Sequence, residues 1–579
     1  MLDESQGRIK MLVAPAGYGK TTLARQWLVD KQAVWYTATP AAADVAALAA
    51  GLRDAVAQVI PGAGDALMER LSVTSRPEEE VRTLELMLAR DLVEWPTDFW
   101  LVIDDYQEMS KSVATEVLIK HLLEDAPLNT LILARKRPRW ASSRRILYGE
   151  IFEVDQRALA MSDEEAAQMI GDNRLSGTDL LSIARGWPAV LALAAVTETR
   201  PRGLVAEPQL YGFFADEIYG QLDRKTRRTL CELALYDRRG RQIALTRAGA
   251  DQAGRAVAHG LACGFLTQGS GAEIELHPLA RDFLQLKLRE EQEQELDVVV
   301  GDAFDALTDQ RLWDEAHSLI EQFNCSDFLP HLVERAMDDL LATGRSATLR
   351  SWLGDSIATH PALLLATAEL AFREGRFYEA EAIAAHAASE LKDAELAAKA
   401  WFVAGRAAHI ASREAQARVH FESAQSLAND ETLKWRAALG GLVAAIELED
   451  PCADELLSSV TPARPLDPVE EVAIADRHLA YETRFSRPVN LHRGRVASQL
   501  LKFVRDPVAR TSFRNIFGYA LASTGHWDEA ASVPRHEVGR VSGSVDLRIF
   551  SWSMASRWTS SGRRMPIPSC GRVWLKSCR

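Results

Sequence analysis

The sequence predicts a multidomain protein in which a parallel α/β domain is followed by a long helical region. Short apolar runs alternate with helical stretches over roughly the first 160 residues, and strand signals fade after that. The later region is rich in alanine and repeats a short motif. The 579 residues are enough for three or four domains of about 100–200 residues each.

Four apolar runs are the predicted strands of the first domain, and helical patterns separate them. The runs cover residues 9–14, 33–36, 99–103 and 130–134, and helices are predicted at 21–29, 81–95 and 113–123. Strands that alternate with helices favour a parallel sheet, because each crossover needs an intervening helix.

The next part of the chain predicts two smaller modules. Short helices are expected at residues 163–170, 179–184 and 210–222. Residues 224–289 combine helical pieces with a strand-like pair, 264–268 and 272–276. Helices with a small hairpin are consistent with a winged-helix module.

The helical region from about residue 295 to 534 contains an internal echo. Leu312-Trp-Asp-Glu-Ala316 recurs as Gly375-Arg-Phe-Tyr-Glu-Ala380, as Gly525-His-Trp-Asp-Glu-Ala530 and, more weakly, as Ser412-Arg-Glu-Ala-Gln-Ala417. The step between the second and fourth of these copies is near the 34 residues of a tetratricopeptide repeat. We expect the glycine in the turn between paired helices and the alanine where the helices approach closely. An ordinary helical bundle is the alternative.

Charge and cysteine content limit the class of protein. A net charge of −14 does not suit non-specific wrapping of nucleic acid, although a small basic module could be hidden in the average. The six cysteines form no CxxC pair, so zinc and redox motifs have no support. The N-terminus lacks the order of a signal peptide, and no apolar run approaches the length of a membrane helix. We expect a cytoplasmic protein without membrane contact.

Residues 535–579 differ from the rest of the chain. They carry nine Lys or Arg against two Asp or Glu, many serines and no periodic pattern. One interpretation is a basic interaction tail. The other is a disordered or out-of-frame end, which the abrupt change of composition favours.

The segment Ala14-Pro-Ala-Gly-Tyr-Gly-Lys-Thr21 predicts a P-loop that binds ATP or ADP with Mg²⁺. Gly17 and Gly19 let the backbone turn so that successive N–H groups face the phosphates, and Lys20 reaches the β- and γ-phosphates. Thr21 offers its hydroxyl to Mg²⁺. The full pattern begins with glycine, but a small alanine should fit there. The predicted nucleotide-binding residues of this segment are Ala14, Pro15, Ala16, Gly17, Tyr18, Gly19, Lys20, Thr21 and Thr22.

Two further strand ends carry candidate site residues. The apolar run 99–103 is followed by Asp104 and Asp105. We assign Asp104 to the metal, through water, and Asp105 to polarising the water that attacks the phosphate, with Lys20 as the other catalytic residue. Arg135 at the tip of the next strand could sense the γ-phosphate. The alternatives are two solvated acids at a strand end and a solvated arginine.

These motifs, in this order, resemble the MalT-like, LuxR-type transcriptional regulators, which are signal-transducing ATPases with numerous domains. The resemblance rests on residues 14–22, on Leu101-Val-Ile-Asp-Asp-Tyr106, and on Ala134-Arg135 with Pro138. It continues in Gly186-Trp-Pro188 and in Leu276-His-Pro-Leu279 followed by Phe283-Leu284. It covers residues 8–290 clearly and the helical region loosely.

The resemblance implies further roles. Gly186 and Pro188 would lie under the adenine, and His277 of the winged-helix module would contact the phosphates. The alternatives are a helix start with Trp187 in a core, and a core histidine. In such proteins ADP locks a closed monomer, whereas ATP and a small-molecule inducer on the helical repeats open it for self-association.

The sequence departs from that family in three places. No LuxR-type helix-turn-helix is found, because residues 535–579 lack helical periodicity, so direct DNA binding has no sequence support. Gln107 stands where a histidine is common and Thr39 where an acid is common. We expect neither to touch the phosphate site.

The expected domains follow from these observations. They are a P-loop NTPase domain at 1–158, a helical domain at 159–222, a winged-helix domain at 223–294, tetratricopeptide-like repeats at 295–534 and the tail at 535–579. The leading interpretation is a slow switch ATPase. A P-loop enzyme or motor with fast turnover and a non-catalytic repeat scaffold are the alternatives.

Overall fold

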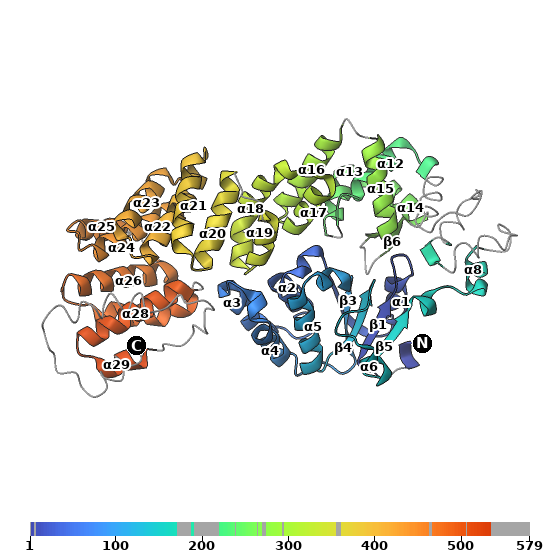
Figure 1. Cartoon of the computed structure of the whole chain (residues 1–579), viewed down its shortest axis with the longest axis horizontal. Coiled ribbons are helices and arrows are strands. Elements are labelled where there is room, and N and C mark those ends of the chain that lie inside the picture. The colour runs from blue at the N-terminus through green and yellow to red at the C-terminus, as the bar shows by residue number, and fades with distance from the viewer. Residues whose placement is uncertain are drawn as a thin grey trace. The chain divides into compact units, whose positions relative to one another are not determined.

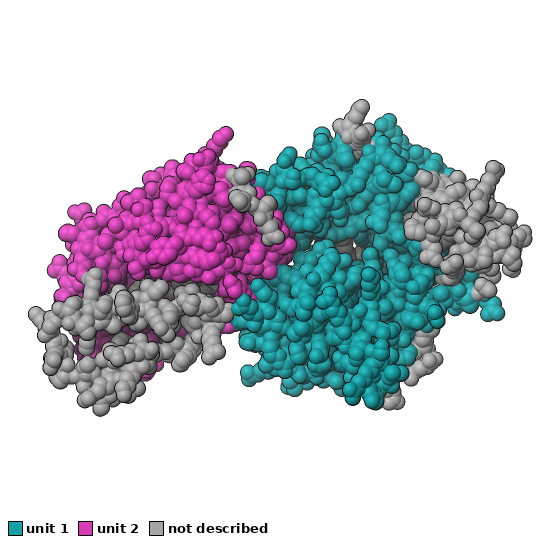
Figure 2. All heavy atoms as spheres, in the orientation of Figure 1, with its two compact units in different colours: residues 1–68, 77–336 teal, residues 69–76, 337–579 magenta. Residues whose placement is uncertain are grey.

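The computed structural model describes residues 2–4, 7–170, 187–189, 191, 219–237, 239–262, 265–268, 274–291, 295–354, 360–461, 466–504 and 507–533. The chain divides into two compact units, residues 1–68 with 77–336 and residues 69–76 with 337–579 (Figure 2). The predicted helix at 179–184, most of the one at 210–222, Gly186 and the tail from 535 lie outside the described residues.

The first unit contains a five-stranded parallel sheet in the order β2-β3-β4-β1-β5 (Figure 1). The strands are β1 (Ile9–Val13), β2 (Gln32–Thr37), β3 (Phe99–Asp104), β4 (Asn129–Ala134) and β5 (Ile151–Asp155). The four predicted strands and the parallel sheet are confirmed. The strand β5 was missed, because this short edge strand carries Glu153 and Asp155 among its five residues.

The central strands are apolar because both faces of the sheet are covered. Leu12, Val102 and Leu131 are fully buried and share a core cluster with Ala24 and Leu28 on the α1 side. The helices are α1 (Lys20–Trp27), α2 (Val45–Val56), α3 (Asp65–Val73), α4 (Val81–Asp91), α5 (Val113–Asp125), α6 (Ser143–Leu147), α7 (Gln156–Leu159) and α8 (Asp163–Ile170). Short 3₁₀ turns are η1 (Leu2–Glu4), η2 (Pro40–Ala43), η3 (Pro77–Glu79) and η4 (Tyr106–Lys111).

Residues 224–291 form helices and a hairpin in the expected order. The elements are α12 (Arg224–Leu233), α13 (Arg241–Ala248), α14 (Ala250–Ala262), β6 (Leu266–Gln268), β7 (Ile274–Leu276) and α15 (Pro278–Glu291). The strands β6 and β7 pair antiparallel. The predicted strand pair is therefore confirmed, and His277 lies at the junction between the hairpin and α15.

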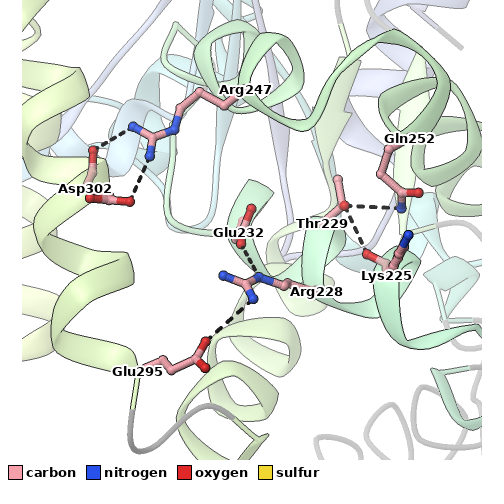
Figure 3. A network of polar contacts seen from close by, with 8 residues as sticks. All are labelled: Lys225, Arg228, Thr229, Glu232, Arg247, Gln252, Glu295 and Asp302. Atoms are coloured by element: carbon pink, nitrogen blue, oxygen red, sulfur yellow. Dashed lines mark hydrogen bonds and ion pairs between the residues drawn. The ribbon is translucent and has the colours of Figure 1, made fainter.

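Ion pairs join this module to the first helix of the repeats (Figure 3). Arg247 on α13 donates to the backbone oxygen and to the carboxylate of Asp302, each at 3.0 Å, on α16 (Leu296–Asp309). Arg228 on α12 bonds Glu232 at 2.8 Å and lies 3.5 Å from Glu295, which precedes α16. The module and α16 belong to the same compact unit.

The remaining helices form successive antiparallel pairs, which in the second unit stack side by side (Figure 1). They are α17 (Trp313–Phe323), α18 (Leu329–Ala342), α19 (Ser346–Leu353), α20 (Pro361–Arg373), α21 (Phe377–Glu390), α22 (Ala394–Ile410), α23 (Glu414–Leu427), α24 (Glu431–Glu447), α25 (Ala453–Val460), α26 (Pro468–Arg484), α27 (Leu491–Leu500), α28 (Pro507–Ser523) and α29 (Trp527–Ser532), with the 3₁₀ turns η5 (Ser326–Phe328) and η6 (Leu501–Phe503).

One turn recurs between the two helices of each pair. A residue with positive φ ends the first helix, at Arg311, Gly344, Gly375, Ser412, Glu449, Ser486 and Gly525, spaced 31 to 39 residues apart. In every case the next N–H bonds the carbonyl five residues back, at 2.8–3.0 Å, which is the six-to-one bond of a Schellman cap. This spacing supports tetratricopeptide-like helix pairs. Three of these turns, at Gly344, Glu449 and Ser486, were missed, because the alanine that ends the echoed motif is replaced there by Leu349, Asp454 and Leu491.

The alanine of each echoed motif lies where the paired helices meet. Ala316, Ala380 and Ala417 are fully buried, and Ala530 is nearly so. A methyl group at this position lets the backbones approach closely, as predicted. Within the described parts of the chain, no helix has the length and apolar character needed to cross a membrane.

Candidate nucleotide site

The P-loop connects β1 to α1 at the carboxyl edge of the sheet. Gly17 and Gly19 adopt left-handed φ angles of 81° and 72°, which glycine reaches without steric cost. The ammonium of Lys20 at the start of α1 donates to the carbonyls of Ala14 at 2.8 Å and Pro15 at 3.0 Å. The loop is therefore wrapped around its lysine, and its geometry fits a polyphosphate cradle.

At this edge of the sheet, burial is the largest cause of the pKa shifts of Lys20 and Asp104. It lowers the pKa of Lys20, and the carboxylates of Asp104 and Asp105 offset part of that effect. Arg135 also lies close enough to affect Lys20, and its positive charge lowers the pKa of Lys20, as burial does. Four of the predicted side chains thus share one electrostatic environment.

Thr21 and Asp104 are the residues expected to hold Mg²⁺, Thr21 by its hydroxyl and Asp104 through water. The hydroxyl of Thr21 donates to Asp104 Oδ2 at 3.1 Å, although the two residues come from α1 and β3. Burial, and next to it the Asp105 carboxylate, raises the pKa of Asp104. A buried carboxylate with a second acid beside it is costly unless a cation compensates the charge, so these residues fit Mg²⁺, which would neutralise phosphate charge when bound.

Asp105 occupies a strained backbone conformation. Its φ is 53°, in the left-handed region that non-glycine residues seldom adopt. Its N–H donates to Asp104 Oδ1 at 2.8 Å, and Gln107 Nε2 donates to its carboxylate at 2.7 Å. The backbone N–H of Arg135 donates to Gln107 Oε1 at 3.2 Å.

The expectation that Gln107 lies apart from the phosphate site is wrong. Its amide group bridges Asp105 after β3 and the Arg135 backbone after β4. Strand β4 lies between β3 and β1 in the sheet, so a long amide on η4 can reach both strand ends. The sequence offers no signal for this, because the strand order is a tertiary feature.

His277, from the hairpin–helix module, lies close enough to the P-loop for the Lys20 ammonium to affect its pKa. Burial, followed by the Lys20 ammonium, lowers the pKa of His277 to about 4, so the imidazole is neutral at physiological pH. The neighbouring Glu275 on β7 forms an ion pair with Arg25 on α1. The hairpin thus contacts the helix that follows the P-loop.

Residues 187–189 also lie against the P-loop. The indole N–H of Trp187 donates to Ala16 O at 3.2 Å, and the Ala189 N–H donates to Gly17 O at 3.1 Å. The Trp187 ring stacks on Tyr18, with centroids 6.3 Å apart. For Trp187 itself the sequence predicts only a place in a core. It is buried, and it lies against the P-loop.

Comparisons with known proteins address the predicted resemblance. No protein-family profile matches the chain. The HTH-type transcriptional regulator MalT of Cronobacter sakazakii (strain ATCC BAA-894) is 25% identical over 417 residues, which are 67% of this chain and 46% of that protein. The crystal structure of a Signal Transduction ATPase with Numerous Domains (STAND) protein with a tetratricopeptide repeat sensor, from Pyrococcus horikoshii, matches with a TM-score of 0.63. That match covers 92% of this chain and 80% of the other, at 15% identity.

The chain is MalT-like in sequence and STAND-like in fold. The predicted resemblance and the predicted fold class, a P-loop α/β domain followed by helical repeats, are therefore confirmed. The chain spans about half the length of the MalT relative that it matches.

The remaining predicted site residues lie at or beside this edge. Thr22 is exposed on α1, and Pro188 is half-buried between two residues that bond the P-loop. The side chain of Arg135 is exposed. Thr39 precedes η2, next to Ala38, whose N–H donates to the backbone oxygen of Asp104 at 2.9 Å. The structure thus brings together segments from β1, β3, β4, residues 187–189 and the hairpin.

Proposed function

We propose that this chain is an ATP-dependent, signal-responsive switch ATPase of the MalT-like kind. Nucleotide binds at the P-loop with Mg²⁺ held by Thr21 and Asp104, and a small-molecule inducer binds the helical repeats. Together they control self-association. The observation that carries the proposal is the wrapping of the P-loop around Lys20, next to the bonded pair Thr21 and Asp104.

The residues suit slow hydrolysis followed by a change of state. Lys20 neutralises charge on the β- and γ-phosphates, and Asp105 orients the attacking water. Gln107 holds the Asp105 carboxylate in place. A neutral His277 can hydrogen-bond a phosphate without adding a buried charge. The winged-helix module would close on the nucleotide through His277 and the Arg25–Glu275 pair.

The switch itself is a population shift. A nucleotide that touches both the P-loop and His277 favours the closed arrangement by the contacts that it makes only there. An inducer on the repeats must favour the open arrangement by its own difference in affinity. In this scheme ADP supports the closed monomer and ATP with inducer the associated form. The proposal does not include DNA binding by the described residues.

Replacing Lys20 by alanine tests the shared premise. We expect the affinity for ATP to fall at least about 100-fold, since the cation that contacts the phosphates is lost, while the thermal unfolding midpoint changes little. Titration calorimetry with Mg-ATP measures the affinity. Lys111→Ala, which removes an exposed lysine paired with Glu108, is the matched control. Unchanged ATP affinity in Lys20→Ala would disprove the nucleotide site.

Two measurements separate the alternatives. Sustained hydrolysis above about 1 s⁻¹ would favour a P-loop enzyme or motor over a switch. Nucleotide exchange without any change in oligomeric state, followed by light scattering, would favour a scaffold whose repeats bind a partner.

A further inference from the structure

The segment 187–189 donates hydrogen bonds to the backbone of the P-loop as well as packing against it. The two hydrogen bonds that the structure shows from this segment to the loop end on backbone carbonyls, Ala16 O and Gly17 O. One donor is an indole N–H and the other a backbone N–H. These carbonyls belong to the two consecutive peptide groups on either side of Gly17.

The geometry of the peptide group gives these bonds a consequence. In a planar trans peptide the C=O and the following N–H point in opposite directions. Holding Ala16 O toward Trp187 therefore aims the Gly17 N–H away from Trp187. Holding Gly17 O toward Ala189 aims the Tyr18 N–H away from Ala189 in the same manner. Successive N–H groups that point to one side form an anion-binding concavity.

Close packing fixes the same arrangement. A methyl group built on Gly17 would lie 2.7 Å from Trp187 Nε1 and 2.8 Å from the Ala189 side chain. Gly17 is thus required for its left-handed φ and also for the approach of the 187–189 segment. On the next residue, Tyr18 stacks on the Trp187 ring and its hydroxyl accepts from Gln156 Nε2 at 2.7 Å.

We infer that Trp187 is a positioning residue for the phosphate-binding loop, and that its indole N–H orients the Gly17 peptide toward the polyphosphate of the nucleotide. The inference rests on the proposed nucleotide binding and assigns Trp187 to the phosphates. A residue that contacts the base would affect every adenine compound. Trp187 should affect only ligands that carry a diphosphate or triphosphate.

The test is Trp187→Phe, which keeps an aromatic ring against Tyr18 but removes the N–H. ATP, inorganic pyrophosphate and adenosine each compete with a fluorescent ATP analogue for the full chain. We expect the affinities for ATP and pyrophosphate to fall about five- to tenfold, as for loss of one hydrogen bond that organises a binding loop, while that for adenosine stays unchanged.

Trp95→Phe is the matched control. Trp95 is buried in the same unit, and its indole N–H also donates to a carbonyl, that of Phe99 at 3.1 Å. It should lower the unfolding midpoint without changing ATP affinity. All affinities are measured well below the midpoint of each variant, so that loss of folded protein is not read as loss of binding.

Three outcomes would overturn the inference. They are an unchanged ATP affinity in Trp187→Phe, a loss for ATP without a loss for pyrophosphate, and a loss in Trp95→Phe as large as in Trp187→Phe. Failure of the wild-type chain to bind ATP would instead refute the proposed function.

Discussion

Asp105 in the first unit and Glu449 in the second share a left-handed backbone, with φ of 53° and 56°. At Glu449 the following N–H bonds Ala445 O at 2.9 Å, and the same bond recurs at each helix-pair turn. At Asp105 the residue's own N–H bonds the Asp104 carboxylate, and its side chain bonds Gln107. The repeated conformation ends a helix, whereas the one at Asp105 aims a carboxylate into the candidate site.

The echoed motif likewise has different roles in the two units. Its glutamate is Glu315 in the first unit and Glu379 in the second. Glu379 is about half exposed and pairs with Arg376, whereas Glu315 is buried and accepts from the Gly240 N–H at 3.2 Å. Identical motif positions thus serve as a surface ion pair in one repeat and as a junction to the hairpin–helix module in another.

The largest effect should come from replacing Asp105 by glycine. This change relieves the left-handed strain and removes the carboxylate, so we expect hydrolysis to fall about 10²–10⁴-fold, the range of general-base contributions. Stability should rise or stay the same. Single-turnover phosphate release measures the hydrolysis rate, and thermal unfolding measures the stability. If hydrolysis stays within threefold of wild type, Asp105 has no catalytic role.

A smaller effect concerns Glu315 and pH. Burial, followed by the nearby Asp237, raises the pKa of Glu315 to about 7 from 4.5, while the Gly240 N–H, Arg239 and Arg281 act in the opposite sense. The folded chain then holds a proton that the unfolded chain releases between these values. The free energy of unfolding of the first unit should fall as pH rises through this range, by up to roughly 3 kcal/mol, and be highest below it.

Glu315→Gln should flatten that dependence, because glutamine cannot ionise and can still accept from Gly240. Urea unfolding between about pH 4.5 and 8 measures the slope. Glu379→Gln, at the equivalent exposed position, is the control and should leave the slope as in wild type. An unaltered slope in Glu315→Gln would mean that Glu315 does not carry the effect.

The smallest effect should come from Glu449→Gly in the repeats. Glycine adopts the left-handed turn without the steric cost that glutamate meets, so we expect a gain of about 0.5–1 kcal/mol in the free energy of unfolding of the second unit. Gly525→Ala tests the reverse, because its φ is 87° and no atom lies within 4 Å of the added methyl group. A loss at Glu449→Gly would show that the ion pair of Glu449 with Arg484, at 3.2 Å, outweighs the steric cost of the turn.

Local sequence patterns predicted much of the first unit. The apolar runs that became β1, β3 and β4 are buried on both faces, and the P-loop follows from glycine spacing. The edge strand β5 escaped because strands with one partner tolerate charged residues. In the repeats, echoed motifs identified four turns, whereas Gly344, Glu449 and Ser486 form the same turn without the alanine that ends the motif. A helix end needs only the backbone bond, which many sequences can make.

The sequence by itself determined the P-loop, the acids at the end of β3 and the paired helices, because each depends on residues that are close along the chain. Only the tertiary structure decided that Gln107 bridges two strand ends, that Trp187 lies on the Gly17 peptide and that Glu315 is buried while Glu379 is exposed. Those contacts depend on strand order and on the approach of distant segments, which no local pattern of residues encodes.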